Sequence, residues 1–184
     1  MSAEPKPRMT VDEFLAWAEG RPGRYELCDG LVVAMSPERV RHADAKFSVQ
    51  MALRAAIGRK ALPCRMLPDG MTVRIDPCTT YEPDALVYCG PRLAPDAVEV
   101  PDPVVVVEVL SPSTKAVDSG AKLAGYFQIP SVQHYLIVDA ERRLVVHHRR
   151  GGGDLIETRI VAEGGLTLDP PGLPLQLSDL FEDL

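Results

Sequence analysis

An acidic residue, Glu108, interrupts the otherwise apolar segment 104–110, which has the sequence VVVVEVL. Short runs rich in β-branched residues are typical of a strand that is buried on both faces. Side chains alternate along a strand, so Glu108 shares one face with Val106 and Leu110. A buried carboxylate loses its hydration, at a cost of roughly several kcal/mol, unless it gains a cationic partner or a metal ion. Glu108 therefore indicates either a structural ion pair or a site that carries chemistry.

A second carboxylate, Asp84, follows Pro83 and precedes the apolar string ALVYC, so it stands at the start of another expected strand. A Pro-Asp pair taken alone is better explained as the beginning of a turn. Two carboxylates on neighbouring strands can, however, hold a hard cation such as Mg²⁺, which completes its coordination with water and phosphate oxygens. Asp84 and Glu108 are therefore candidate metal ligands.

A third group, Lys122, lies on the helix expected directly after the Glu108 strand. That helix is predicted to begin with Asp118 as its N-cap and to end before Pro130. Asp118, Lys122 and Tyr126 are spaced four residues apart and share one helical stripe. An isolated Asp-Lys pair at this spacing is usually exposed and weak. The position of Lys122, next to the strand of Glu108, favours a larger role.

Helices and strands alternate in the first part of the chain. Thr10 and Glu13 match a capping box for a first helix that stops at Gly20. The Asp29-Gly30 pair between two short apolar runs predicts a hairpin. Residues 38–58 predict a second helix, and its apolar face is expected to comprise Val40, Ala43, Phe47, Met51 and Ala55.

Further strands are expected in the remainder of the chain. Residues 64–75 predict a hairpin whose turn is formed by residues 68–70. Residues 134–140 and 143–149 predict two strands joined by a tight turn, and residues 154–161 predict another. The alternation of helices and strands, without a repeat or a linker, indicates a single α/β or α+β domain.

Composition excludes several classes of protein. The 184 residues are 46% hydrophobic and 25% charged, which suits one globular domain with a sizeable core. No apolar run is long enough to span a membrane, and the first residues lack the apolar core of a secretory signal, so we expect a cytoplasmic protein with no membrane partner. The net charge of −6 gives no general attraction to nucleic acid. Cys28, Cys64, Cys78 and Cys89 lack zinc-site spacing, so reduced thiols are expected.

The strings PDALV and VVVVEVLSPST, followed by Asp118, Lys122 and Tyr126, resemble the Uma-two family of restriction endonuclease-like proteins, a branch of the PD-(D/E)XK nuclease superfamily. The upstream string YELCDGLVVAMSP, which is followed by His42, is also similar to this family, as is HYLIVDA after the helix. The resemblance covers about residues 10–140, and residues 141–184 add C-terminal strands and a short tail.

The resemblance implies a single restriction endonuclease-like domain over residues 1–184, with a central mixed sheet flanked by helices. It also implies hydrolysis of DNA with Mg²⁺ or Mn²⁺ bound by Asp84 and Glu108. Lys122 would polarise the attacking water or neutralise charge on the phosphate. Glu26, His42, Asp118 and Tyr126 are the supporting residues that it suggests. Dimers are common among enzymes that cut both strands, so a homodimer is compatible with this function.

The chain departs from the superfamily pattern at one position. The lysine of that pattern lies two residues after the glutamate, where this sequence has Leu110, so Lys122 would have to act from the helix. Two alternatives therefore remain open. One is a non-catalytic module that binds nucleic acid or supports an assembly and retains the nuclease fold. The other is a purely structural Glu108–Lys122 ion pair in an unrelated α/β enzyme.

Overall fold

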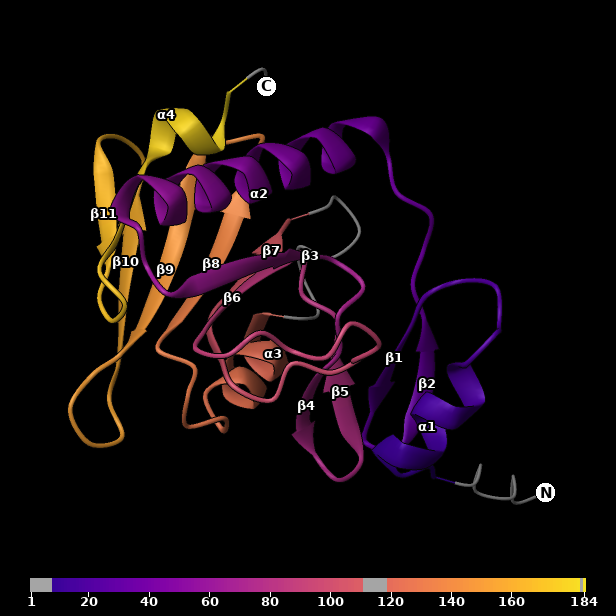
Figure 1. Cartoon of the computed structure of the whole chain (residues 1–184). Helices are drawn as coiled ribbons and strands as arrows, with labels where there is room; N and C mark the ends of the chain where they lie inside the picture. Colours follow the sequence, from indigo (N-terminus) through magenta and orange to yellow (C-terminus); the bar gives the residue numbers. More distant parts are fainter. Residues whose placement is uncertain (1–7, 111–118, 183) are drawn as a thin grey trace.

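A six-stranded mixed sheet forms the centre of the computed structural model, which describes residues 8–110, 119–182 and 184 (Figure 1). Its strand order is β10-β9-β8-β7-β6-β3. β7 and β8 are parallel, and the other neighbouring strands of this sheet are antiparallel. The strands are β3 (Cys64–Pro68), β6 (Ala85–Cys89), β7 (Pro103–Val109), β8 (His134–Asp139), β9 (Leu144–Arg150) and β10 (Ile156–Val161).

Two smaller sheets complete the β structure. The first has the order β2-β1-β5-β4 and is built from β1 (Tyr25–Cys28), β2 (Leu31–Ala34), β4 (Val73–Asp76) and β5 (Thr79–Tyr81). The second pairs β11 (Gly165–Leu168) with β12 (Leu173–Gln176). The helices are α1 (Val11–Ala18), α2 (Val40–Lys60), α3 (Ser119–Tyr126) and α4 (Leu177–Leu180).

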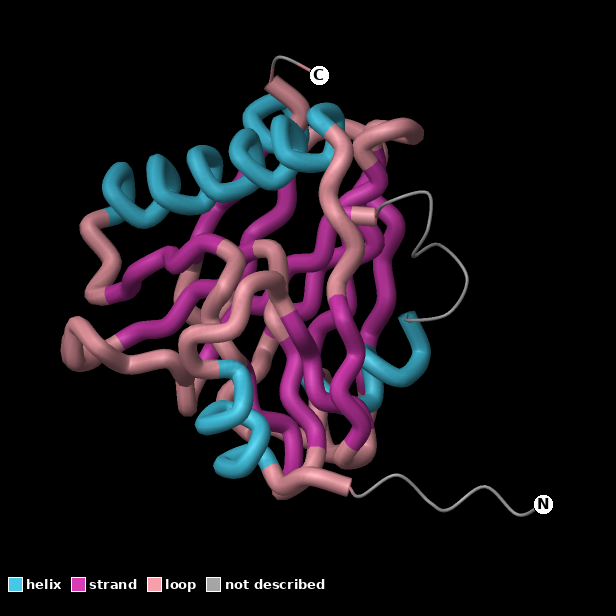
Figure 2. Tube along the Cα trace, turned by 90° about the vertical axis from the view of Figure 1, so that its right-hand side faces the viewer, coloured by secondary structure: helices cyan, strands magenta, loops and turns pink. Residues whose placement is uncertain are grey.

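The two faces of the six-stranded sheet carry two different hydrophobic clusters. α2, α4 and β12 cover one face, where Val49 and Leu53 pack with Val105 and Val107. α3 and the smaller β1-containing sheet lie on the other side, and Tyr126 belongs to the cluster on that face. The views in Figures 1 and 2 show α2 crossing the sheet at a distance from α3. β7 lies between these layers, as the apolar run around Glu108 predicts.

Local sequence signals identified several elements correctly. Thr10 caps α1, and it forms the reciprocal capping-box bonds with Glu13. The Asp29-Gly30 pair forms the turn between β1 and β2, and both residues have positive φ, of 48° and 77°. A Cβ on Gly30 would lie 2.7 Å from Cβ of Arg8, so glycine is also required by the close approach of the preceding segment.

The predicted hairpin over residues 64–75 is wrong. β3 pairs with β6 in the six-stranded sheet, whereas β4 pairs with β5 in the smaller sheet. The turn at residues 68–70 therefore carries the chain from one sheet to another. Turn residues specify a change of direction, but the strand partners are chosen by burial of both faces, which the local sequence does not encode.

The predicted apolar face of α2 is also wrong. Val40, Phe47 and Met51 are exposed, whereas Ala45, Val49 and Ala52 lie in the core. The helix has apolar residues on more than one stripe, so periodicity alone does not decide which stripe faces the sheet. The stripe that is buried carries small residues, which allow the helix to approach the sheet closely.

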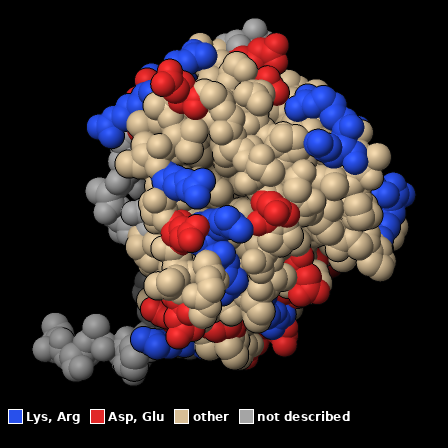
Figure 3. All heavy atoms as spheres, turned by 90° about the vertical axis from the view of Figure 1, so that its left-hand side faces the viewer, with Lys and Arg blue, Asp and Glu red and all other residues tan. Residues whose placement is uncertain are grey.

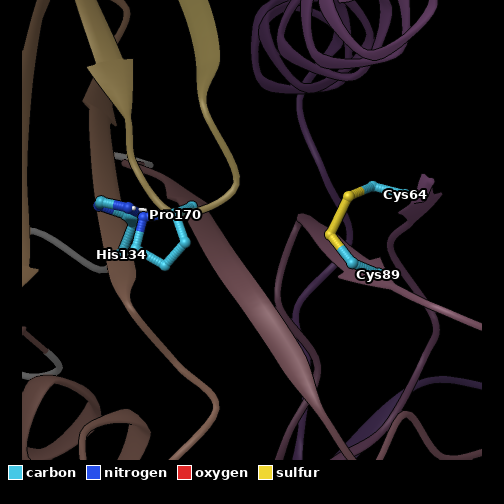
Figure 4. The surroundings of a disulfide bond; sticks show 4 residues. All are labelled: Cys64, Cys89, His134 and Pro170. Atoms are coloured by element: carbon cyan, nitrogen blue, oxygen red, sulfur yellow. Dashed lines mark hydrogen bonds between the residues drawn. A yellow bond between two sulfur atoms is a disulfide. The ribbon is translucent and has the colours of Figure 1, made fainter. Parts of the chain in front are cut away.

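The expectation of reduced cysteines is corrected for one pair. Cys64 and Cys89 face each other across β3 and β6 and form a disulfide bond (Figure 4). Cys28 and Cys78 are not disulfide-bonded. Sequence spacing did not indicate this pair, because the two strands become neighbours only through the sheet pairing.

Within the part of the chain that the structure describes, no helix is long and apolar enough to cross a membrane.

Candidate active site

Glu108 lies near the carboxyl end of β7, on the sheet face that is covered by α3. Its side chain keeps 16% of its surface exposed. Oε1 accepts a hydrogen bond from the Tyr126 hydroxyl at 2.7 Å and another from Lys122 Nζ at 3.1 Å. The glutamate in the apolar run is therefore paired from the helix that follows its own strand.

Lys122 connects two carboxylates. Its ammonium group donates to Oε1 of Glu26 at 2.9 Å as well as to Glu108, and the residue is only 6% exposed. Nζ also lies 5.3 Å from the centre of the Tyr81 ring, a distance at which the ring face attracts a cation. Lys122 thus brings β1 and β7 together through their acidic side chains.

Gly125 allows α3 to hold Lys122 and Tyr126 at this depth. A Cβ at position 125 would lie 2.8 Å from Cε2 of Tyr81 and 3.4 Å from Cγ2 of Ile75. Contacts shorter than about 3 Å force a rearrangement in a packed core. The absence of a side chain at Gly125 therefore sets how closely the helix approaches the smaller sheet.

Asp84 directly precedes β6 and is bound to the end of β7. Its Oδ2 accepts a 2.7 Å hydrogen bond from the Val109 amide, and the residue is 6% exposed. The backbone carbonyl of Asp84 accepts from Gln50 Nε2 on α2 at 2.9 Å. These bonds place the Asp84 carboxylate at the same end of the sheet as Glu108, because β6 and β7 are antiparallel.

His42 lies on the α2 side of Asp84. Its Nε2 is 2.9 Å from the carbonyl oxygen of Val109, so Nε2 carries the hydrogen and donates it. The same nitrogen is 3.9 Å from Oδ2 of Asp84. Among the described residues Nδ1 of His42 is buried without a hydrogen-bond partner, and Oε2 of Glu38 is 3.8 Å away.

A second charged cluster adjoins Asp84 and was missed by sequence reasoning. Lys46, one helical turn after His42, places Nζ 3.8 Å from Oδ1 of Asp84 and 2.7 Å from Oδ2 of Asp69, and it also binds Glu38. Arg24 Nη1 lies 2.6 Å from the same Asp69 oxygen. A lysine on a helix is normally exposed, so no sequence signal predicted that Lys46 would be buried.

Arg24 links this cluster back to Glu26. Its Nε donates to Oε2 of Glu82 at 3.0 Å, and the Glu82 amide donates to Oε1 of Glu26 at 3.0 Å. Burial raises the pKa of Glu82, although the nearby Arg24 lowers it in part. The acidic residues of the site are therefore held in one connected network of charges.

The pKa values of Glu108, Asp84 and Lys122 show that burial of these acidic side chains close together is energetically unfavourable. Burial raises the pKa of Glu108 to about 7, and repulsion from Asp84 and Glu26 adds to the increase, while Lys122 and Tyr126 oppose it. Burial also raises the pKa of Asp84, against the stabilising Val109 amide. Burial alone would lower the pKa of Lys122, but Glu108 and Glu26 raise it well above its usual range. Lys122 is therefore a cation at neutral pH.

The donor set fits a hard divalent cation. Within residues 8–110, 119–182 and 184, no three histidine, cysteine or acidic side chains form a cluster that could hold a metal by themselves. Mg²⁺ usually takes only one or two carboxylates and keeps several water or phosphate ligands. The carboxylates of Asp84 and Glu108 are oxygen donors of this kind, and repulsion from Asp84 adds to the effect of burial on the pKa of Glu108.

The structure therefore brings Asp84, Glu108, Lys122, Glu26 and Tyr126 to one end of the sheet, with His42 beside Asp84. Asp118, the remaining candidate, lies outside the described residues.

Comparison with known proteins gives the family of the chain. A family model described as "Uma2: Putative restriction endonuclease" matches residues 11–181. The chain belongs to the Uma2 family. An uncharacterized Synechocystis protein, slr1290, is 29% identical over 98% of this chain and 95% of its own length. A second, sll1609, is 25% identical over 78% of this chain and 82% of its own length.

A solved structure shows the same fold as this Uma2 chain. The crystal structure of a putative nuclease belonging to DUF820 from Anabaena variabilis superimposes with a TM-score of 0.70 at 17% identity. The match covers 94% of this chain and 97% of the other. The expected α+β architecture, with a central mixed sheet flanked by helices, is confirmed.

Proposed function

We propose that this Uma2 protein is a metal-dependent DNA endonuclease that hydrolyses phosphodiester bonds. The observation that carries the proposal is the convergence of Asp84, Glu108 and a buried, protonated Lys122 at one end of the sheet. Buried carboxylates with raised pKa values beside a cation are more frequent at functional sites than elsewhere. The restriction endonuclease description of the family supports the same reaction class.

Asp84 and Glu108 are the proposed ligands of Mg²⁺ or Mn²⁺. A bound divalent ion supplies a water of lowered pKa and stabilises charge on a phosphate oxygen. The Val109 amide fixes Oδ2 of Asp84, and the Tyr126 hydroxyl fixes Oε1 of Glu108. Both carboxylates are therefore orientated before a ligand arrives, which reduces the reorganisation needed in the reaction.

Lys122 acts as a positive charge in this proposal and not as a base. Its raised pKa keeps the ammonium group protonated across the physiological range, so it cannot accept the proton of a water molecule. The ammonium group can neutralise the negative charge that develops on the phosphate during attack. The bonds to Glu26 and Glu108 hold it in place for that role.

A non-catalytic module that binds nucleic acid is the second candidate. One observation favours it: Lys122 already contacts two carboxylates, so the Glu26–Lys122–Glu108 arrangement satisfies its own charges. An ion pair of this kind needs no substrate to be stable. The net charge of −6 also provides no general attraction to DNA.

Plasmid cleavage separates these functions. Supercoiled DNA is incubated with the protein in Mg²⁺, in Mn²⁺ and in chelator, alongside Glu108→Gln and Asp84→Asn. Nicking that requires the metal and falls by roughly a hundredfold or more in both variants supports the enzyme. Glu163 is an exposed acidic residue that is not among the candidate site residues. Glu163→Gln is therefore the matched control and should cleave normally.

Titration calorimetry tests the metal directly. Mn²⁺ binding to the native chain should be lost in Glu108→Gln and retained in Glu163→Gln. Metal binding without cleavage would favour the non-catalytic module. If the native chain releases no heat with Mn²⁺ at pH 8, the two-carboxylate metal site is wrong.

A further inference from the structure

β10 is an open edge of the six-stranded sheet. The strand pairs with β9 on one side, and it is the terminal strand of the sheet on the other. Residues 156–160 are all exposed, including Ile156 at 40% and Ile160 at 71%. Leu155, just before the strand, is 69% exposed. Among the strands that the structure describes, none pairs with the outer side of β10, so apolar side chains lie beside an open backbone edge.

Proteins usually protect such an edge, and the opposite edge of this sheet shows how. β3 is shorter, ends in Pro68, and is partly buried against α2. β10 has six residues, no proline or lysine, and a continuous register with β9 that lacks a bulge. Strands of this kind are templates for pairing with another chain.

The sequence of β10 is complementary to itself around Thr158. If two copies pair antiparallel with Thr158 opposite Thr158, then Ile156 lies opposite Ile160 of the second copy. In the same register Glu157 lies opposite Arg159. Apolar residues therefore meet apolar residues, and each acidic residue meets a basic one, on both sides of the two-fold axis.

The two faces of the strand separate these contacts. Ile156, Thr158 and Ile160 lie on one face, and Glu157 and Arg159 lie on the other. The pairing would therefore form an apolar row on the first face and two Glu-Arg pairs on the second. The side of the molecule that includes β10 shows acidic and basic side chains interspersed with uncharged surface (Figure 3).

We propose that β10 is the interface for a second copy of this chain, joined by antiparallel edge pairing centred on Thr158. The pairing extends the six-stranded sheet of one protomer into that of the other. Ile160 shares its sheet face with Val146, Ile137 and Glu108 through the strand register. Directly opposed residues lie on the same face, so both copies of Glu108 would lie on one face of the joined sheet.

The contact is small, so we expect an equilibrium that depends on protein concentration. Interfaces that bury less than about 1,200 Å² are mostly transient. Sedimentation of the full-length chain over a range of concentrations should therefore show monomer and dimer in exchange. A chain that sediments as a monomer at all concentrations, up to several hundred micromolar, would overturn the proposal.

Charge reversal tests the register. Glu157→Arg places two arginines opposite each other at both pairs, and Arg159→Glu places two glutamates there. Each variant should weaken dimerisation on the order of tenfold, because two cross-strand pairs change from attraction to repulsion. The double variant Glu157→Arg/Arg159→Glu restores both pairs and should dimerise like the native chain.

Mixing gives the sharpest readout. An equimolar mixture of Glu157→Arg and Arg159→Glu has opposite charges at both cross-strand pairs, so the heterodimer should form more strongly than the homodimer of either variant. The control Glu163→Arg makes the same charge change outside the strand and should leave dimerisation unchanged. Thermal unfolding establishes that each variant is folded. A dimer that is insensitive to both single changes, or variants that do not rescue one another, would place the interface elsewhere.

Discussion

The hydroxyl of Tyr126 donates to Oε1 of Glu108 over 2.7 Å, from a position with no exposed surface. This bond helps to keep Glu108 ionised, because it opposes the effect of burial on the pKa of the carboxyl group. The Tyr126 ring also packs against Tyr81 and Tyr135, with centroids 5.3 Å and 5.1 Å away. Its structural and electrostatic contributions can therefore be separated by removing the oxygen alone.

Tyr126→Phe should raise the pKa of Glu108 above its present value of about 7 and so weaken metal binding at neutral pH. Metal ions bind the ionised carboxylate, so affinity in the native chain should increase as the pH rises through about 7, and the variant should need a higher pH. Mn²⁺ titration between pH 6 and 9 measures the midpoint. An unchanged midpoint would show that the hydroxyl does not act on Glu108.

Gly125→Ala should destabilise the protein although alanine is the better helix former. The added methyl would meet the Tyr81 ring, and the cost of overpacking, about 1–3 kcal/mol, exceeds the gain in helix propensity of about 1 kcal/mol. Gly120 lies in the same helix, and no atom of the described residues comes within 4 Å of the position that its Cβ would take, so Gly120→Ala is the matched control and should be neutral or stabilising. Urea unfolding compares the two, and equal free energies of unfolding would contradict the steric argument.

The sequence predicted those parts of the site that depend on local order. Glu108 was identifiable because it interrupts an apolar strand, and Lys122 and Tyr126 because they are four residues apart on the next helix. Lys46 and Asp69 were not identifiable, because their burial depends on how α2 and the turn after β3 pack around Asp84. The β3–β4 hairpin was mispredicted for the same reason. Partners that are distant in sequence are selected by tertiary packing.

Two buried histidines should make stability depend on pH. His134 Nε2 donates to the carbonyl of Pro170 at 2.9 Å (Figure 4), so its Nδ1 is left to accept a hydrogen from Nε2 of His147 at 2.9 Å. Burial lowers the pKa of both His134 and His147 to about 4, and interaction with His134 further lowers that of His147. The pair is therefore neutral in the folded protein at neutral pH.

The unfolded chain binds protons at these histidines from about pH 6.5 downwards, whereas the folded chain does not until about pH 4. Stability should therefore fall between pH 6.5 and 4, by about a few kcal/mol in total. His147→Asn should be less stable at pH 7 but should show a shallower loss over this range. Urea unfolding at several pH values measures both quantities. The raised pKa of Glu108 makes stability change with pH in the opposite direction. This contribution cancels when the free energy of unfolding of the variant is subtracted from that of the native chain at each pH. Parallel curves would mean that His147 does not contribute to the acid sensitivity.

The Cys64–Cys89 bond should stabilise the fold without affecting the candidate active site. It joins the start of β3 to the end of β6 across 25 residues of chain, whereas Asp84 lies before the opposite end of β6. Loss of a bond with a loop of this size typically costs about 2–4 kcal/mol. Reductant should therefore lower the melting temperature of the native chain, and it should have no effect on the Cys64→Ala/Cys89→Ala variant.

Mn²⁺ affinity should be the same for both proteins at a temperature where both are folded, because the bonds that hold Asp84 come from Val109 and Gln50. A large loss of metal affinity in the double variant would instead connect the disulfide-bonded end of the sheet to the site.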